Sequence, residues 1–350
     1  MDDSINPKKP ILVTGASGYI ASWIVKYLLE KGHTVHGTVR SKKDERKTAH
    51  LSNIQPKDGG KLKLFEADLL NEGDFDEAIK RCELVIHTAS PFKFQGIKDP
   101  QKELIDPALI GTRNVLEAAN RNKSTKRVVL TSSVVAIFGD PADIKGKDRD
   151  YFTESDWNTT SNLKHQPYSF SKTLAEQEAW KIKENQSDWD LIVINPGFVM
   201  GPSLSKRLDS TSVSFIKALV DGTYKSGVPE LHFGFVDVRD VARAHILAGF
   251  KPDASGRHIL VAGSKSMMEV VDILKSEYDD LKLPSSTVPK LLLYLIGPFN
   301  GFSWKYISRN VGIPLKFDNS YSKKDLGIEY ADIEETLTDH VAQLKSAKLI

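Results

Sequence analysis

The sequence predicts an α/β protein built on a doubly wound parallel sheet, with a smaller lobe at its C-terminal end. Short β-branched runs alternate with longer segments of helical apolar spacing over the first two-thirds of the 350 residues. A glycine-rich turn, Gly15 to Gly18, directly follows the first of these runs. After Pro196 the alternation loosens, and glycines and prolines interrupt the chain more often.

The alternating elements justify the parallel sheet. Segments with apolar residues at helical spacing, such as Ile20–Lys31 and Pro107–Asn120, separate the apolar runs. Strands that alternate with helices form a parallel sheet covered on both faces, and six of them indicate a Rossmann-type fold. The predicted strands are Ile11–Thr14, Thr34–Val39, Leu62–Ala67, Leu84–Thr88, Arg127–Thr131 and Leu191–Asn195.

The same pattern divides the chain into two parts. Residues 8–199 are expected to form the Rossmann domain. Residues 233–250 are expected to return to it, because the pattern from Val236 to His245 is typical of a strand end followed by a helix. Residues 200–232 and 251–345 are expected to form a substrate-binding lobe over the carboxyl edge of the sheet.

Composition excludes several classes of function. A formal net charge of +2 lacks the concentrated basic field that nucleic acid or an anionic membrane requires. The histidines show no metal-ligand spacing, so no metal site is expected. Cys82 is the single cysteine, and the N-terminus has no apolar stretch of the signal-peptide kind, so we expect a cytoplasmic protein.

The glycine turn predicts a dinucleotide site. Gly15 permits the tight turn, Gly18 lets the backbone approach a pyrophosphate, and Ala21 is the third small residue, where helix meets strand. The free N–H groups and the dipole at the start of the helix favour an anion.

The end of the second strand favours NADPH over NADH. NAD enzymes usually carry an acid about 20 residues past the glycines, to bind the ribose 2′-hydroxyl. This chain has Arg40 there, followed by Lys42, Lys43 and Lys47, and a guanidinium matches a phosphate well. A solvated basic loop is the alternative, since Asp44 and Glu45 lie in the same stretch.

A tyrosine four residues before a lysine shares one helix face with it. The lysine cation can lower the pKa of the phenol, which can then donate a proton to a carbonyl oxygen as hydride arrives. Only Tyr168/Lys172 lies between the fifth and sixth strands, where a helix can pass the nicotinamide. The other pairs with this spacing are Tyr27/Lys31 in the first helix and Tyr278/Lys282 in the C-terminal lobe.

A pair of serines, Ser132 and Ser133, follows the fifth strand. A hydroxyl at this strand end can donate a hydrogen bond to the same carbonyl oxygen as Tyr168. Serine is common at strand ends, so the pair gains weight only together with Tyr168 and Lys172.

These motifs resemble those of the extended short-chain dehydrogenases/reductases, and within them the dihydroflavonol-reductase-like branch, which includes plant dihydroflavonol and cinnamoyl-CoA reductases and yeast ketone and methylglyoxal reductases. The similarity covers residues 9 to 340. It is carried by Val13-Thr-Gly-Ala-Ser-Gly-Tyr-Ile20, Thr38-Val-Arg40, Asp68-Leu69, His87-Thr-Ala-Ser-Pro91, Gly111-Thr-Arg-Asn-Val-Leu116, Arg127-Val-Val-Leu-Thr-Ser-Ser133, Tyr168-Ser-Phe-Ser-Lys172, Leu174-Ala-Glu176, Asn195-Pro-Gly197 and Asp237-Val-Arg-Asp-Val241.

The resemblance implies a role for each matching residue. Ser133 would polarise the substrate carbonyl, Tyr168 would donate the proton, and Lys172 would tune Tyr168 and bind the nicotinamide ribose. Arg40 and Lys47 would bind the 2′-phosphate of NADPH. The other cofactor contacts implied are Gly15, Ser17, Gly18, Tyr19 and Ile20 at the turn, Asp68 and Leu69 at the adenine, Thr88, Ala89 and Ser90 along the middle, and Pro196 and Val199 at the nicotinamide.

Two departures from the plant pattern bear on the substrate. Plant flavonoid reductases carry a polar residue five positions after the serine, where this chain has Phe138. Plant cinnamoyl-CoA reductases carry asparagine-tryptophan before the tyrosine, where this chain has His165-Gln-Pro167. We therefore expect a small-molecule aldehyde or ketone, as in the yeast members, with Phe92, Phe138 and His165 lining the pocket. The physiological substrate, the stereochemistry, the direction of reaction and the choice between monomer and homodimer stay open.

Three other functions compete. A nucleotide-sugar epimerase would carry an acid in place of Arg40, and a dehydratase would carry one beside the catalytic hydroxyl, where this chain has Ser132, Ser133 and Val134. A 3β-hydroxysteroid dehydrogenase-like enzyme is a further alternative. A non-enzymatic NADP sensor would have no need of a serine, a tyrosine and a lysine in this arrangement.

Overall fold

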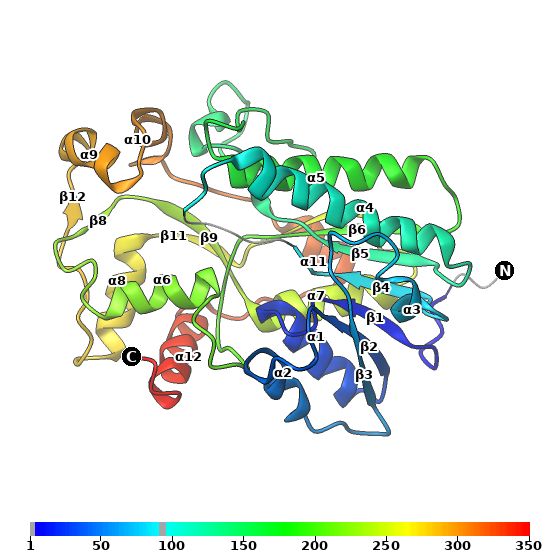
Figure 1. The fold of residues 1–350 in the computed structure, drawn as a ribbon. Helices are drawn as coiled ribbons and strands as arrows, with labels where there is room; N and C mark the ends of the chain where they lie inside the picture. The colour runs from blue at the N-terminus through cyan, green and yellow to red at the C-terminus, as the bar shows by residue number, and fades with distance from the viewer. Residues whose placement is uncertain (1–3, 91–95) are drawn as a thin grey trace.

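The computed structural model describes residues 4–90 and 96–350 (Figure 1). Within these residues, the main sheet has seven strands, all parallel, in the order β10-β6-β5-β4-β1-β2-β3. The strand order reverses between β1 and β4, and ligands of such sheets bind at the carboxyl ends of the strands on either side of that point. The strands are β1 Ile11–Thr14, β2 Thr34–Val39, β3 Lys61–Glu66, β4 Leu84–His87, β5 Arg127–Thr131, β6 Asp190–Pro196 and β10 Gly256–Leu260.

Helices cover both faces of this sheet. Ile11 and Val13 of β1 pack into one apolar cluster with α1 and α7, whereas Leu12 points to the other face, toward α4 and α5. Figure 1 shows α4 and α5 above the sheet and α1 and α7 below it. The helices of this part are α1 Tyr19–Glu30, α2 Glu45–Ser52, α3 Asp76–Ile79, the π-helical η1 Gln101–Ile105, α4 Asp106–Arg121, α5 Pro167–Glu184 and α7 Val238–Phe250.

The seventh strand, β10, was not predicted. The sequence analysis expected six strands and assigned residues 251–345 to the lobe, but β10 pairs in parallel with β6, from Gly256↔Ile192 to Leu260↔Pro196. Arg257 and His258 interrupt the apolar run of β10, and both are buried. Their polar partners inside the protein are invisible to a pattern based on hydrophobicity.

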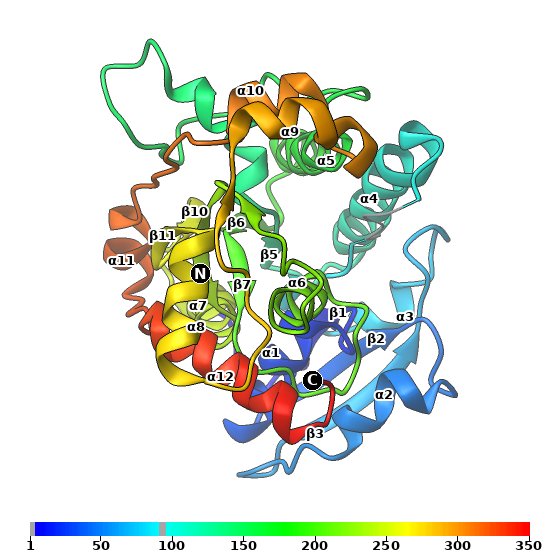
Figure 2. The ribbon, with the colours of Figure 1, turned by 90° about the vertical axis from the view of Figure 1, so that its left-hand side faces the viewer.

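The second lobe is built on two small sheets. Within the described residues, β11-β9-β7 form one and β12-β8 the other, and α6, α8 and α12 share an apolar core with them. Figure 2 shows α8 and α12 side by side. The elements are β7 Phe198–Met200, β8 Val228–Pro229, β9 His232–Asp237, β11 Gly263–Ser266, β12 Thr287–Val288, α6 Thr211–Val220, α8 Met267–Glu277, α9 Lys290–Ile296, α10 Trp304–Asn310, α11 Ser320–Leu326 and α12 Ile333–Ser346.

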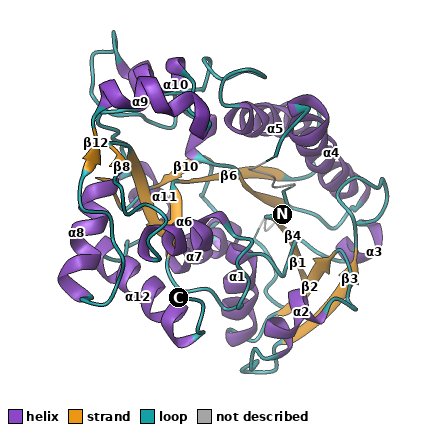
Figure 3. Cartoon of the chain, turned by 60° about the vertical axis from the view of Figure 1, so that its left-hand side comes forward, coloured by secondary structure: helices purple, strands orange, loops and turns teal. Residues whose placement is uncertain are grey.

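Short 3-10 helices complete the chain: η2 Val134–Ala136 and η3 Pro141–Ile144 follow β5, and η4 Gly297–Asn300 follows α9. Figure 3 shows the strands of the main sheet enclosed by helices, with the lobe to one side. In the part of the chain that the structure describes, no helix combines the length and the apolar character needed to cross a bilayer.

Candidate active site

The turn between β1 and α1 forms the floor of the candidate site. Gly15 has a φ of +65°, a conformation that favours glycine. A Cβ at Gly15 would lie only 3.1 Å from the Cα and Cβ of Ala89. Gly18 precedes α1 and has no side chain to cap its first N–H groups. The turn therefore presents backbone donors at a helix N-terminus, as a pyrophosphate requires.

The ends of β1 and β4 are tied together beside this turn. The Thr14 hydroxyl lies 2.8 Å from Nδ1 of His87 and accepts from the backbone N–H of Ala89 at 3.1 Å. The Thr88 hydroxyl donates to the Thr14 carbonyl at 2.6 Å. Thr88, Ala89 and Ser90 are thus held at the point where the strand order reverses, next to Gly15.

The predicted phosphate-binding residues follow β2. Thr38 accepts from the N–H of Gly15 through its hydroxyl (3.2 Å) and from Ala16 through its carbonyl (2.9 Å), which places the end of β2 against the glycine turn. Arg40 is exposed two residues later. Lys47 lies in α2, with its Nζ 3.7 Å from a carboxylate oxygen of Asp44.

Sequence reasoning missed a third cation at this turn. Arg207, in the loop after β7, donates from Nη1 to the backbone carbonyl of Ser17 at 3.2 Å. Its Nη2 donates to the carboxylate of Asp209 at 2.5 Å, which partly neutralises its charge. Because loop residues follow no periodic pattern, the sequence could not predict that Arg207 contacts the glycine turn.

The remaining predicted cofactor residues border the same edge of the sheet. Asp68 accepts from the N–H of Leu70, and Leu69 is buried against Gly111 of α4. Tyr19 donates to the carbonyl of Gly201 at 2.6 Å, and both Tyr19 and Ile20 are half-buried. Pro196 ends β6, and Val199 lies buried in β7.

Tyr168 and Lys172 lie one turn apart at the start of α5, and both are half-buried. Lys172 donates from Nζ to the hydroxyl of Ser90 at 3.1 Å, which connects α5 to the end of β4. Burial raises the pKa of Tyr168 to about 12 and lowers the pKa of Lys172 to about 8. The sequence analysis expected a lowered pKa for the phenol; in the structure, burial dominates and keeps Tyr168 protonated.

The two competing tyrosine–lysine pairs lie elsewhere. Tyr27 packs on Trp23 in α1, with ring centroids 5.5 Å apart. Tyr278 is the residue that ends α8, so Lys282 does not share its helix, and its hydroxyl donates to the carbonyl of Thr338 at 3.0 Å.

The two serines after β5 differ in their surroundings. Ser132 is buried and donates to the carboxylate of Glu176 at 2.5 Å. Ser133 is half-buried, caps η2 by accepting from the N–H of Val135 at 3.3 Å, and lies 3.5 Å from the carbonyl of Pro196. Ser133 is therefore the serine whose hydroxyl remains near the surface of the site.

The predicted pocket residues have mixed outcomes. Phe138 is buried in an aromatic cluster, with its ring 5.1 Å from that of Phe152 and 5.4 Å from that of Phe317, so its side chain serves the core rather than an open pocket. His165 is buried and paired with Asp140. Phe92 lies outside the described residues.

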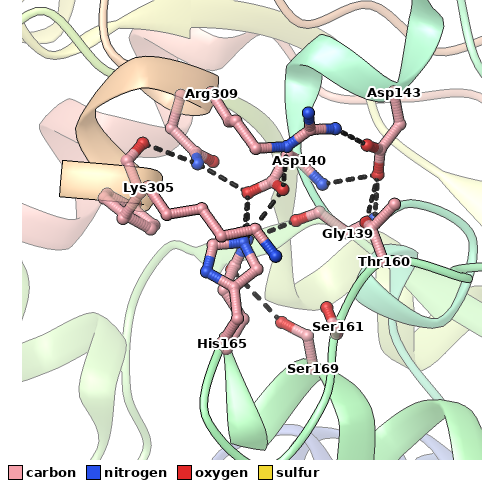
Figure 4. Close-up of polar contacts among 12 residues, drawn as sticks. Gly139, Asp140, Asp143, Thr160, Ser161, His165, Ser169, Lys305 and Arg309 are labelled. Atoms are coloured by element: carbon pink, nitrogen blue, oxygen red, sulfur yellow. Dashed lines mark hydrogen bonds and ion pairs between the residues drawn. The ribbon is translucent and has the colours of Figure 1, made fainter. Parts of the chain in front are cut away.

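Asp140 is the centre of a polar cluster at the start of α5 (Figure 4). Its carboxylate lies 2.9 Å from Nε2 of His165 and accepts from Gln166 at 2.7 Å. Arg309 and Asn310 of α10 also donate to it, each at 2.7 Å. Gln166 has a φ of +54°, which is strained for a residue other than glycine, and these contacts hold it. The cluster thereby fixes the position from which α5, and Tyr168 with it, begins.

Within residues 4–90 and 96–350, no group of three or more histidine, cysteine, aspartate or glutamate side chains is arranged to hold a metal ion.

Comparison with solved structures supports the fold and finds neighbours that bind NADPH. The chain is similar to Gre2 of Candida albicans in complex with NADPH, at 32% identity and a TM-score of 0.79, covering 97% of this chain and 99% of that one. It is also similar to yeast methylglyoxal/isovaleraldehyde reductase Gre2 complexed with NADPH, at 29% identity and a TM-score of 0.77, covering 97% of this chain and 100% of that one.

Comparison with curated proteins finds plant reductases. A cinnamoyl-CoA reductase (CAD2) of Medicago truncatula is 43% identical, over 99% of this chain and 98% of its own length. Tetraketide alpha-pyrone reductase 1 of Arabidopsis thaliana is 38% identical, over 96% of this chain and 95% of its own length. The resemblance to plant cinnamoyl-CoA reductases and to the yeast reductases is thus confirmed, and the substrate expected from the yeast members stays a prediction.

A family model described as the NAD dependent epimerase/dehydratase family matches residues 11–263. The match covers most of the chain and includes the glycine turn, both serines, Tyr168 and Lys172. With the full-length similarity to plant reductases, it shows that this chain belongs to the NAD dependent epimerase/dehydratase family, the extended short-chain dehydrogenases/reductases.

Proposed function

We propose that this chain reduces an aldehyde or ketone to the alcohol, with NADPH as the hydride source and Tyr168 as the proton donor. The observation that carries the proposal is the pair of Tyr168 and Lys172 on the first turns of α5, joined through Ser90 to the point where the strand order reverses. The similar proteins named above are reductases, and both Gre2 structures hold NADPH.

The residues at the carboxyl edge fit a dinucleotide. Gly15 has no room for a side chain on the side of Ala89, and Gly18 opens α1 with uncapped donors, so the turn accepts a pyrophosphate. Arg40 and Lys47 supply cations where an NAD enzyme would carry an acid, which favours the 2′-phosphate of NADPH. When bound, NADPH supplies the hydride.

Residues of the chain then bind and protonate the carbonyl oxygen of the substrate. Ser133 donates a hydrogen bond to it, and Tyr168 gives up its phenolic proton as negative charge develops there. A pKa of about 12 keeps Tyr168 protonated before the reaction. Lys172, with a pKa of about 8, is mostly charged at neutral pH and stabilises the phenolate that forms.

The substrate side of the site is assigned to the second lobe, formed by residues 200–232 and the residues after β10. The proposed substrate is a small carbonyl compound, and the names of the plant relatives make cinnamoyl-CoA and a tetraketide alpha-pyrone worth including in a screen. The single cysteine, Cys82, is buried, and burial raises the pKa of its thiol, so we expect it to be unreactive.

A substrate screen tests the proposal. NADPH oxidation is followed with a panel of aldehydes, ketones and acyl thioesters. For the competing classes, oxidation of a 3β-hydroxysteroid is followed by NADP+ reduction, and conversion of a nucleotide sugar by analysis of its products. Turnover on a carbonyl compound, reduced about 10²–10⁴-fold in Tyr168→Phe with NADPH affinity retained, is the expected result. Turnover of the nucleotide sugar or the steroid alone, or a near-normal rate in Tyr168→Phe, would overturn it.

A further inference from the structure

Glu176 lies on α5 one turn beyond Lys172 and is fully buried. The Ser132 hydroxyl donates to one of its carboxylate oxygens at 2.5 Å, and Nδ2 of Asn195 donates to the same oxygen at 2.8 Å. Asn195 also donates to the backbone carbonyl of Ser133 at 3.2 Å. The carboxylate therefore joins the catalytic helix to the ends of β5 and β6, where Ser133 lies.

Arg257 of β10 neutralises the far side of this carboxylate. Its Nε lies 2.5 Å from Oε1 of Glu176, and its own side chain is 8% exposed. Nη1 donates to the carbonyls of Glu154 at 2.8 Å and Asp156 at 2.6 Å, and the guanidinium lies 3.8 Å from the ring centroid of Trp157. Arg257 is thus fixed in place and cannot swing away from Glu176.

Lys172 and Glu176 also line the same small pocket, which has a volume of about 20 Å³. The pocket has room for about one water molecule. Residues of β4, α4 and β5 close it on the other sides: His87, Ser90, Ala108, Thr112, Leu130, Thr131 and Ser132.

The charges that act on Lys172 follow from these neighbours. Burial lowers the pKa of its ammonium, and the carboxylate of Glu176 raises it. His87 of β4 has a pKa lowered to about 3 by burial and by the charge of Lys172, so it stays neutral at working pH. Tyr168 is protonated and also neutral. Among the described residues that line the pocket, Glu176 is therefore the charged group that acts on Lys172, and Arg257 lies on its other side.

We propose that Glu176 is a positioning residue that keeps Lys172 charged, and that the positive charge of Arg257 weakens the effect of the Glu176 carboxylate on Lys172. The inference rests on the proposed function, because it assigns Lys172 the role given there. Glu176 touches neither substrate nor cofactor in this assignment: it acts through Lys172 on one side and through the Ser132–Ser133 segment on the other.

Two substitutions with effects of opposite sign test the inference. Glu176→Gln removes the carboxylate and leaves the Arg257 cation unbalanced, so the alkaline limb of the turnover–pH profile should move down by about one pH unit or more. Arg257→Gln removes the cation that offsets the charge of Glu176, so the alkaline limb should move up. Loss of packing lowers turnover in either variant, but it cannot shift the two limbs in opposite directions.

The measurements are turnover by NADPH oxidation and NADPH affinity by fluorescence titration, each across pH 6 to 10. Glu178→Gln is the matched control, because Glu178 lies on the same helix but pairs with Arg113 at the surface, and its profile should equal that of the unsubstituted protein. Glu176→Asp keeps the charge and should keep the alkaline limb. Circular dichroism of each variant checks that it folds.

The outcomes separate the inference from the proposed function. The role of Glu176 is overturned if the alkaline limbs of the Glu176→Gln and Arg257→Gln profiles stay in place or move in the same direction. This holds even when Tyr168→Phe is inactive. If one of the two variants fails to fold, the direction in which the alkaline limb moves in the other variant still tests the role of Glu176. An active Tyr168→Phe variant overturns the proposed function instead, whatever the limbs do.

Discussion

Arg207 donates to the backbone carbonyl of Ser17 at 3.2 Å and so joins the loop after β7 to the glycine turn. The same loop is attached to α1 at two further points. Tyr19 donates to the carbonyl of Gly201 at 2.6 Å, and the indole of Trp23 donates to the carbonyl of Pro202 at 2.9 Å. The loop therefore lies along the N-terminus of α1, where the pyrophosphate is expected.

We expect Arg207→Ala to weaken NADPH binding. The side chain is partly exposed and shares its charge with Asp209, so a loss of about 1 kcal/mol, roughly fivefold in affinity, is the expected size. Fluorescence titration of NADPH measures it. Lys206→Ala, at the exposed neighbouring position, is the control and should bind normally; equal weakening in both would point to a general charge effect.

Arg40→Asp should reverse the cofactor preference. The substitution deletes a charge-assisted contact to the 2′-phosphate worth about 1.5–3 kcal/mol, or roughly 10- to 150-fold, and adds repulsion. The ratio of kcat/KM for NADPH to that for NADH reports the change. A variant that retains its preference for NADPH would show that another residue reads the phosphate.

The two neighbouring serines should respond differently to alanine. Ser133→Ala should lose turnover while binding NADPH normally, because it removes a donor to the carbonyl oxygen. Ser132→Ala should instead cost about 1–2 kcal/mol of unfolding free energy, because the buried carboxylate of Glu176 loses a donor. Urea unfolding and steady-state kinetics on both variants separate these effects. The reverse result would exchange the roles of the two serines.

Tyr27→Phe and Tyr278→Phe should keep turnover within a few-fold of the unsubstituted protein. Tyr27 packs on Trp23 in α1, and Tyr278 bonds to Thr338 at the end of α8. Steady-state rates on any accepted carbonyl compound test this. Collapse of turnover in a folded Tyr278→Phe variant, with Tyr168→Phe active, would show that the wrong helix was chosen.

Three buried histidines should make the fold sensitive to acid. Burial lowers the pKa of His87 to about 3 and the pKa values of His245 and His340 to about 4, against an ordinary 6.5. Between pH 6.5 and 4 the unfolded chain binds protons that the folded chain does not. Stability is therefore full above pH 6.5 and falls with pH, by about 1.4 kcal/mol per pH unit for each histidine.

Urea unfolding at pH 7.5, 6 and 5 measures this dependence. His245→Gln should reduce the slope of the unfolding free energy with pH by the contribution of one histidine, about 1.4 kcal/mol per pH unit. The variant also loses the contact of His245 with Thr131, which lowers stability without changing this slope. An unfolding free energy that does not vary with pH would show that these side chains gain no proton on unfolding.

The part of the fold that could be predicted follows local pattern. β1 and β5 occur at the predicted residues, because each is an uninterrupted buried run bounded by a turn. β10 was missed, since two of its five residues, Arg257 and His258, are polar and satisfied only by distant partners.

The candidate site shows the same limit. The glycine turn and the spacing of Tyr168 and Lys172 are local and could be read from the sequence. Arg207 and Asp140 could not, because their partners lie 190 and up to 170 residues away along the chain. The raised pKa of Tyr168 depends on burial, which residue spacing does not encode.

The cluster around Asp140 has a mechanical consequence. Arg309 and Asn310 hold α10 of the lobe to the same carboxylate that holds the start of α5. A swing of the whole lobe away from the sheet would break these contacts and leave a buried carboxylate short of donors, at a cost of several kcal/mol. A lobe swung away from the sheet is thus a minor state, and we expect exchange of reactants and products to depend mainly on the smaller motions of surface loops.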